Sequence, residues 1–205
     1  MKKWFVVIAF SLLFTMAAFA QDVPKFEVPV GFSFVNVHPQ AAGITSFNVF
    51  GGGGGFVYNV TPLIGIRADL MGYTQSSGHQ VTENGQVVGN VSGNLFTYLF
   101  GPQIKKHSGK IQPFGAALFG AAHTNLYSNI CNLEGGCGSG SGSNNGFAMQ
   151  YGLGLDVPIT KSIQFRPVEV DYLYTHFGSN HIQGASSSQN NFKYFAGVNF
   201  TFGGK

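Results

Sequence analysis

The sequence predicts an all-β protein, an eight-stranded antiparallel up-and-down transmembrane β-barrel, on three observations. Apolar residues recur at every second position in repeated stretches, which clusters of Gly, Ser and Asn interrupt. Charged residues form only 9% of the 205 residues, whereas about 25% is usual for a soluble domain. The connections between the stretches alternate between short and long, as they do in barrels that cross a membrane.

The N-terminal segment has the pattern of a secretory signal peptide. Lys2 and Lys3 precede an apolar run over residues 4–13, and the segment closes on the small residues Ala18 and Ala20. We expect cleavage after Ala20, so that residues 1–20 are the signal peptide and residues 21–205 form one barrel domain. A membrane-anchoring helix is the alternative interpretation. After residue 20 no apolar run approaches the about 20 residues that a membrane helix requires.

The first predicted strand covers residues 25–35 and has two different faces. One face is apolar and largely aromatic, and it consists of Phe26, Val28, Val30, Phe32 and Phe34. The other face carries Glu27, Gly31 and Ser33. Because side chains alternate between the two faces of a strand, this pattern predicts one oily side and one partly polar side.

The second predicted strand covers residues 44–60 and contains five consecutive glycines, Gly51–Gly55. Glycine weakens an ordinary strand. In a small barrel it also leaves room where the wall bends sharply or where the lumen is crowded. The alternative is a flexible loop that joins two shorter strands.

The third strand is predicted over residues 64–73, with Arg67 and Asp69 opposite an apolar face. The fourth and fifth strands are predicted over residues 94–105 and 111–124. Their alternation is less regular, so the sequence leaves their inward and outward faces open.

The last three strands alternate clearly. The sixth covers residues 147–157, the seventh residues 163–177 and the eighth residues 192–202. Pro167 predicts a bulge in the seventh strand, which leaves the face of Arg166 undetermined. The eighth strand has an apolar face that consists of Phe192, Tyr194, Ala196, Val198, Phe200 and Phe202.

The connections differ in length on the two sides of the predicted barrel. Short turns are expected at residues 60–63, 105–110 and 158–162. The other connections are mostly longer and are rich in Ser, Asn, Gly and Gln; they cover residues 36–43, 74–93, 125–146 and 178–191. An even number of strands, with short turns on one side and long loops on the other, is typical of a bacterial outer-membrane barrel.

Most of the few charged residues fall on the non-apolar faces of the strands. They are Glu27, Arg67, Asp69, Asp156, Glu169, Asp171 and Lys193, with Arg166 as a further candidate. The apolar faces are too aromatic and too long to fill one narrow lumen, so we expect them to face lipid and the charges to face inward. Buried carboxylates need partners, and a guanidinium can hold two of them.

We therefore expect a lumen plugged by structural ion pairs. The alternatives are a narrow proton or ion path, or a carboxylate pair for general acid–base catalysis. In a soluble barrel that binds an apolar ligand, the orientation would be reversed, with the apolar face inside.

The remaining candidate residues give little sign of chemistry. Cys131 and Cys137 are expected to form a disulfide, with metal binding as the alternative. The six histidines show no metal-ligand spacing, so neither a metal nor a cofactor is expected.

Lipid A deacylases have a His-x-Ser-Asn arrangement in a small barrel. Here His176 and Ser179 are three residues apart, on opposite faces of a regular strand, so we expect no enzyme activity.

Aromatic residues near the predicted strand ends have two interpretations. They are Tyr58, Tyr73, Tyr98, Tyr172, Tyr174 and Phe177. They either anchor the barrel at the level of the lipid headgroups or reflect the strand propensity of aromatic residues.

Five segments resemble outer-membrane β-barrel proteins of the OmpA/OmpX type: PLIGIRADL, QPFGAALFGAA, YGLGLDVPIT, RPVEVDYLYT and YFAGVNFTF. The resemblance covers residues 25–202 and implies an eight-stranded barrel with Arg67, Asp156, Arg166 and Asp171 inside. In this family an aromatic residue that ends the last strand is read during membrane insertion. Phe202 matches it, with Phe200 and Tyr194 in register, although Gly203-Gly204-Lys205 follows.

The expected function is that of an outer-membrane barrel with a structural role in the envelope, or with a surface-interaction role through its long loops. The runner-up hypotheses are a lipid-modifying enzyme of the lipid A hydrolase or transferase type and a narrow ion pore. The expected partners are outer-membrane lipid and lipopolysaccharide, and the barrel assembly machinery during insertion. We expect a monomer, and the net charge of +3 is too small and too scattered to indicate nucleic-acid binding.

Overall fold

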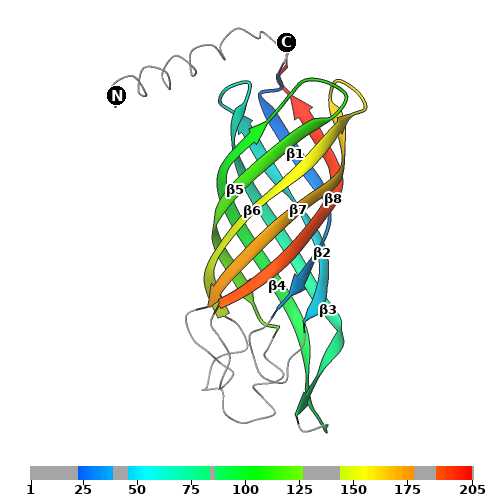
Figure 1. Cartoon of the computed structure of the whole chain (residues 1–205), viewed down its shortest axis with the longest axis vertical. Helices are drawn as coiled ribbons and strands as arrows, with labels where there is room; N and C mark the ends of the chain where they lie inside the picture. Colours follow the sequence, from blue (N-terminus) through cyan, green and yellow to red (C-terminus); the bar gives the residue numbers. More distant parts are fainter. Residues whose placement is uncertain (1–22, 39–45, 84–85, 127–143, 178–187, 205) are drawn as a thin grey trace, which may run out of the picture.

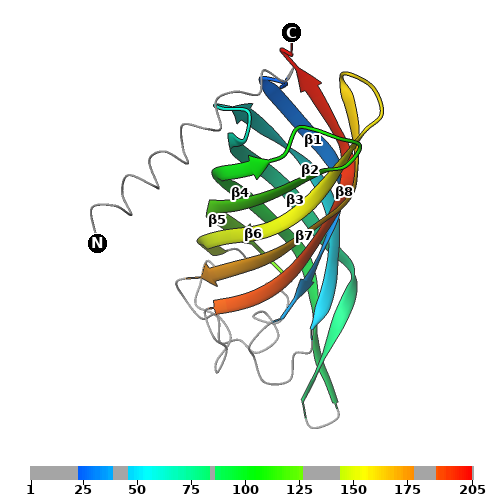
Figure 2. The same ribbon diagram turned by 45° about the horizontal axis from the view of Figure 1, so that its top comes forward.

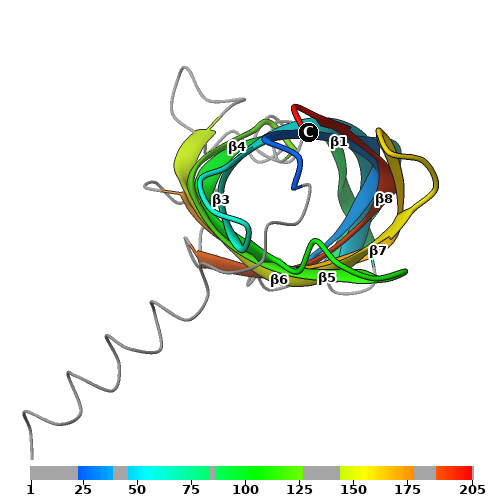
Figure 3. The same ribbon diagram turned by 90° about the horizontal axis from the view of Figure 1, so that it is seen from above.

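The chain folds into one closed barrel of eight antiparallel strands, each paired with its neighbours in sequence, and β1 pairs with β8. The computed structural model describes residues 23–38, 46–83, 86–126, 144–177 and 188–204. The strands are β1 (Phe26–Val37), β2 (Phe47–Asn59), β3 (Ile64–Glu83), β4 (Gln86–Lys105), β5 (Gln112–Thr124), β6 (Asn144–Pro158), β7 (Ile163–Phe177) and β8 (Ser188–Phe202). They slant around the barrel axis and close into a ring (Figures 1 and 3). The predicted fold class is confirmed.

Most strand bounds lie within three residues of the prediction, but β8 begins four residues before its predicted start, and one hairpin differs more. Residues 74–93 were expected to form a loop, but β3 continues to Glu83 and β4 begins at Gln86. The two strands remain paired almost to their tip, with Glu83 opposite Gln86. This hairpin projects beyond the other strands at the end of the barrel (Figure 2). Its polar composition hid the strands from a pattern search that relies on apolar alternation.

The two ends of the barrel differ in their connections. The short turns at residues 60–63, 106–111 and 159–162 lie at the same end as the C-terminus of β8 (Figure 1). The β3–β4 hairpin extends from the opposite end. In outer-membrane barrels the short turns face the periplasm and the longer connections face outward. We therefore call the two ends the turn end and the loop end.

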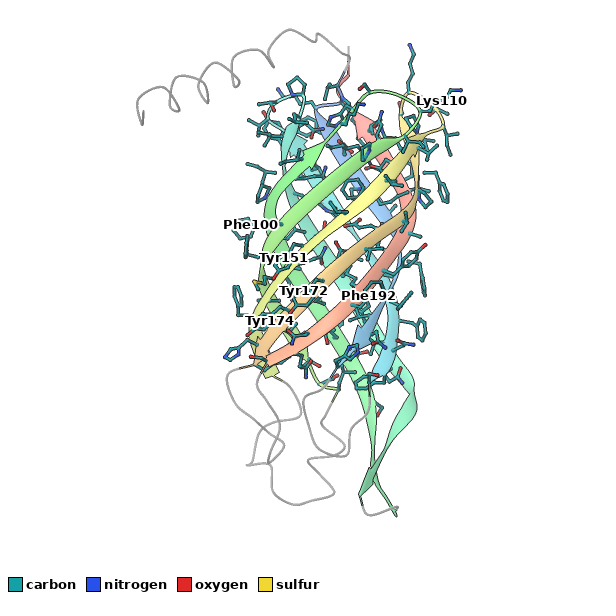
Figure 4. All side chains as sticks on the ribbon, in the orientation of Figure 1. Phe100, Lys110, Tyr151, Tyr172, Tyr174 and Phe192 are labelled. Atoms are coloured by element: carbon teal, nitrogen blue, oxygen red, sulfur yellow. The ribbon has the colours of Figure 1, made fainter. Side chains whose placement is uncertain are left out.

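The apolar faces of the strands point away from the barrel, as predicted. Phe32 is 56% exposed and Leu153 is 72% exposed, whereas Arg67 is 2% and Asp171 is 1% exposed. Figure 4 shows Phe100, Tyr151, Tyr172 and Phe192 on the outer surface. A soluble barrel with an apolar interior would have the reverse arrangement, so the outer surface suits lipid.

The glycine run belongs to the barrel wall. Gly51–Gly54 pair with β1 and Gly51–Gly55 pair with β3 within the continuous strand β2, so the alternative of a loop is wrong. A Cβ atom at Gly51 would overlap the carbonyl oxygen of Gly72, and one at Gly55 would overlap the carboxylate of Asp69. The glycines thus permit both a close approach of the wall strands and the inward position of Asp69.

This packing predicts that Gly51→Ala destabilises the barrel by about 1–3 kcal/mol, because the added methyl group meets backbone atoms that have little freedom to move. Urea unfolding in lipid vesicles would measure the change. Gly72→Ala is the control, since its Cβ would meet only the ring of Phe96, at 3.0 Å. Equal stability of Gly51→Ala and the native chain would contradict this account of the glycine run.

The lumen is divided into two unlike halves. Toward the loop end it is filled by an apolar core whose members include Val35, Val37, Phe47, Val49, Leu95, Leu99, Leu118, Ala122, Leu126, Leu173 and Phe177. Toward the turn end it is filled by buried charged and amide side chains. The sequence predicted only small residues and charges inside, so the apolar half was missed. In these strand segments the inward and the outward residues are both apolar, so the sequence shows no alternation with a period of two.

Candidate functional site

The candidate site is the set of ionised side chains inside the barrel, from its turn end to its middle, which we call the lumen network. It comprises Glu27, Arg67, Asp69, Lys105, Asp156, Arg166, Glu169, Asp171 and Lys193, none more than 2% exposed. These residues lie on six strands and point to the barrel axis because each occupies an inward position of its strand. They meet only because the sheet is closed.

Lys105 joins the carboxylates of two different strands. Its Nζ lies 2.5 Å from Glu27 Oε2 and 2.7 Å from Asp156 Oδ2. The third donor direction is taken by Gln164 Oε1, at 2.8 Å. Asn199 Nδ2 donates to Glu27 Oε2 at 2.6 Å. The ammonium group is therefore fully hydrogen-bonded, as burial of its charge requires.

His107 closes the network at the turn end. Its Nε2 lies 2.8 Å from Glu27 Oε1, and its Nδ1 lies 2.8 Å from the carbonyl oxygen of Pro62. Asn59 Nδ2 lies 3.3 Å from the same Nε2 atom, so this ring nitrogen meets an amide group as well as the carboxylate. Asn59 Nδ2 also donates to Glu27 Oε1, at 2.8 Å. Glu27 is thus held by side chains from three strands of the wall and from one turn.

Arg166 links the Lys105 pair to the middle of the barrel. Its Nε donates to Asp156 Oδ1 at 2.7 Å, its Nη2 donates to Asp156 Oδ2 at 3.0 Å, and its Nη1 donates to Glu169 Oε2 at 2.7 Å. The guanidinium also lies 4.1 Å from the ring centroid of Phe114. This two-carboxylate contact uses the planar geometry of arginine, which lysine lacks.

The register of β7 shifts between Arg166 and Glu169, at the predicted bulge beside Pro167. The shift lets Arg166 and Glu169 both point inward although they are three residues apart, which a regular strand does not allow. The question of which face Arg166 occupies is thereby answered: its side chain is 0% exposed, inside the barrel.

Arg67 continues the chain of contacts across the lumen. Its Nη2 lies 2.8 Å from Glu169 Oε1 and its Nε lies 2.7 Å from Asp69 Oδ1. A separate pair lies nearer the loop end, where Lys193 Nζ is 3.2 Å from Asp171 Oδ2 and 3.0 Å from Gln150 Oε1. Ion pairs therefore connect Glu27 to Asp69 without a break, through Lys105, Asp156, Arg166, Glu169 and Arg67.

All eight charged residues singled out from the sequence lie inside the barrel, and each contacts an opposite charge. Sequence reasoning missed Lys105, which it placed at the end of the fourth predicted strand and the start of the following turn, with the faces of that strand left open. The alternation of Gln103, Ile104, Lys105 and Lys106 could have found it, because Gln103 and Lys105 are buried while Ile104 is exposed. The amide partners Asn59, Gln164 and Asn199 were also missed, since nothing distinguishes an inward amide from a surface one in sequence.

Other predicted residues have different outcomes. Tyr73 and Phe177 are buried in the lumen rather than placed at the lipid headgroups, since both occupy inward positions of their strands. Phe202 lies exposed at the end of β8, with Tyr194 and Phe200 on the same outward face. Cys131, Cys137 and Ser179 lie outside the described residues, as does the segment 1–20.

A second group of polar contacts lies outside the barrel at the loop end. His176 Nδ1 lies 3.0 Å from Ser188 Oγ, which is also 2.9 Å from the hydroxyl oxygen of Tyr174. Nearby, the Tyr172 hydroxyl donates to Asn190 Oδ1. Figure 4 shows Tyr172 and Tyr174 on the outside of the wall near this end. These side chains form cross-strand pairs between β7 and β8.

The lumen network is built to hold charge in place. In the lumen network, the guanidinium groups of the arginines and the ammonium groups of the lysines all face carboxylate and amide oxygens. No cluster of His, Cys, Asp and Glu suited to a metal ion occurs among the residues whose positions are described. Among the same residues, no helix has the length and apolar character needed to cross a membrane.

Comparison with known proteins agrees with this architecture. Residues 5–203 match the family model described as "Outer membrane protein beta-barrel domain". The crystal structure of Neisserial surface protein A is 12% identical, covers 87% of this chain and 97% of its own, and superposes with a TM-score of 0.57. The outer membrane protein OprG from Pseudomonas aeruginosa is 14% identical, covers 88% and 96%, and gives a TM-score of 0.48. No protein of curated function matches at a significant level.

At such low identity the likeness to Neisserial surface protein A concerns the fold alone. The family match extends over nearly the whole chain, and the outer surface is apolar where lipid would lie. The chain therefore belongs to the outer membrane protein β-barrel domain family and is a protein of the bacterial outer membrane.

Proposed function

We propose that this protein is a non-conducting barrel that holds its long connections at the cell surface, where they serve envelope integrity or binding of other surface molecules. The observation that carries the proposal is the unbroken series of buried ion pairs from Glu27 to Asp69 across the lumen. A barrel closed by its own side chains is suited to anchoring rather than transport. Because a closed sheet has no free edge, the barrel needs no partner to complete it, and we propose that it acts as a monomer.

The physical reason for closure is the cost of opening. An ion that entered from the turn end would have to separate Lys105 from Glu27 and Asp156, which lie 2.5 and 2.7 Å away. Separating such pairs leaves buried charges without partners, at a cost of several kcal/mol for each. Beyond them lies the apolar core around Leu99, Leu118 and Leu173, which offers no ligands to a dehydrated ion.

Recordings in planar bilayers would test closure. We expect no steady conductance from the native chain and measurable conductance from Arg67→Ser combined with Arg166→Ser, which removes two large side chains from the lumen. Lys161→Ser is the control, because Lys161 is exposed in a turn. Steady ion conductance by the native chain would overturn the proposal of a sealed barrel.

The surface role needs a separate test, which shortens the connections that contain residues 127–143 and 178–187. Heat-modifiable gel migration would show that each variant retains its barrel. We then expect a loss of adhesion or a change in envelope permeability in cells that carry the variants. If neither property changed in either variant, the surface role would be wrong.

A second candidate function is lipid modification at the outer leaflet, and one observation favours it. The contact of His176 with Ser188 at 3.0 Å places a base beside a hydroxyl on the lipid-facing side. Mass spectrometry of lipid A with and without the protein would decide. An altered acyl pattern that disappears in Ser188→Ala would replace the anchoring role with an enzymatic one.

A further inference from the structure

The exposed basic residues of this chain are distributed very unevenly between the two ends of the barrel. Of its 11 Lys and Arg, two precede the barrel at Lys2 and Lys3, and Lys205 ends the chain. Four more are buried in the lumen network: Arg67, Lys105, Arg166 and Lys193. The remaining four are exposed and all lie at the turn end: Lys25, Lys106, Lys110 and Lys161. We call these four the basic rim.

No negative charge offsets the basic rim among the described residues of the turn end. The two acidic residues there, Glu27 and Asp156, are 0% exposed and are paired inside the lumen. Long connections at the other end contribute no Lys or Arg: residues 36–48, 74–93, 125–146 and 178–191 contain none. The exposed positive charge of the barrel is therefore concentrated on the side that faces the periplasm.

Large apolar side chains accompany the basic rim. Ile111, beside Lys110, is 57% exposed, and Ile159, close to Lys161, is 65% exposed. Lys25 Nζ lies 5.8 Å from the ring centroid of the outward-facing Tyr58. Figure 4 shows Lys110 at the turn end, at the edge of the wall. Lysine and isoleucine side by side suit the boundary between lipid headgroups and acyl chains, where each side chain meets its preferred surroundings.

We propose that the basic rim binds the headgroups of anionic phospholipids in the periplasmic leaflet of the outer membrane. The apolar neighbours decide between this partner and a soluble periplasmic polyanion, because exposed isoleucines favour a site that is partly in lipid. The belt of outward apolar residues on the strands continues directly into the rim through Ile104 and Ile163. Such a contact would fix the depth of the turn end in the membrane.

The full-length mature chain is refolded into phosphatidylcholine vesicles that contain a small amount of one spin-labelled lipid. The experiment compares how strongly the chain binds spin-labelled phosphatidylglycerol and spin-labelled phosphatidylcholine. A lysine near an anionic membrane surface contributes about 1 kcal/mol, or about a five-fold change in affinity. We expect up to about a five-fold preference for phosphatidylglycerol, because one headgroup contacts one or two lysines. The preference should disappear at about 1 M salt, where the Debye length falls to about 3 Å.

The variant carries Lys25→Gln, Lys106→Gln, Lys110→Gln and Lys161→Gln together, and we expect it to bind the two lipids equally. Its matched control carries Arg at the same four positions and should retain the preference. All four positions are exposed, so folding should persist, and heat-modifiable gel migration would check this. Equal selectivity of the native chain and the Gln variant would overturn the proposal. Lysine-dependent binding to isolated peptidoglycan without lipid selectivity would also overturn it.

Discussion

Arg166→Met is expected to lower the free energy of unfolding of the membrane-inserted barrel by about 3–5 kcal/mol, the range for breaking a buried ion pair by removing one partner. Arg166 holds Asp156 with two hydrogen bonds and Glu169 with a third. After the substitution Asp156 keeps Lys105 and Glu169 keeps Arg67, but the lumen contains one cation fewer. Equilibrium unfolding by urea in lipid vesicles would measure the loss.

Two further variants make this result specific. Arg166→Met combined with Asp156→Asn removes one charge of each sign, and we expect it to regain part of the lost stability. Lys106→Met removes an exposed lysine at the turn end and, in vesicles of phosphatidylcholine alone, should change stability by less than about 1 kcal/mol. A loss below about 1 kcal/mol for Arg166→Met would mean that the lumen admits water freely, contrary to the 0% exposure of Arg166.

Leu153→Arg is expected to cost about 2–4 kcal/mol, the penalty for a cation on the lipid face near the bilayer midplane. Leu153 is 72% exposed, close to the middle of β6 (Asn144–Pro158), and lies opposite Gly115 on β5 and Val170 on β7. If the same surface met water, arginine would be tolerated there without loss. The measurement is again unfolding by urea in vesicles.

The control substitution is at a residue that is similarly exposed but lies at a different depth in the membrane. Ile159 is 65% exposed in the turn between β6 and β7, and a charge near the interface costs only about 0–1 kcal/mol. We therefore expect Ile159→Arg to be nearly neutral. Equal effects of the two substitutions would contradict a lipid-facing wall, because the two sites have similar exposure but lie at different depths in the membrane.

The alternation of side chains made most of the fold predictable. In β1 and β6 each apolar residue of one face faces outward and Glu27 and Asp156 face inward, as the pattern indicated. The method failed where both faces have the same character. Residues 74–93 of the β3–β4 hairpin are mostly polar or Gly in sequence and show no regular apolar alternation, and near Leu173 both the inner and the outer face are apolar. A period of two is visible only when the two faces differ.

The sequence by itself determined the number of strands, the outward direction of the aromatic faces and the inward direction of most charges, because these depend on local alternation. Only the tertiary structure decided which charges meet. Glu27 and Lys105 are separated by 78 residues, and they touch because the stagger and closure of the barrel bring β1 and β4 to the same level. Stagger is a property of the whole ring of strands, so it cannot be read from the sequence of any single strand.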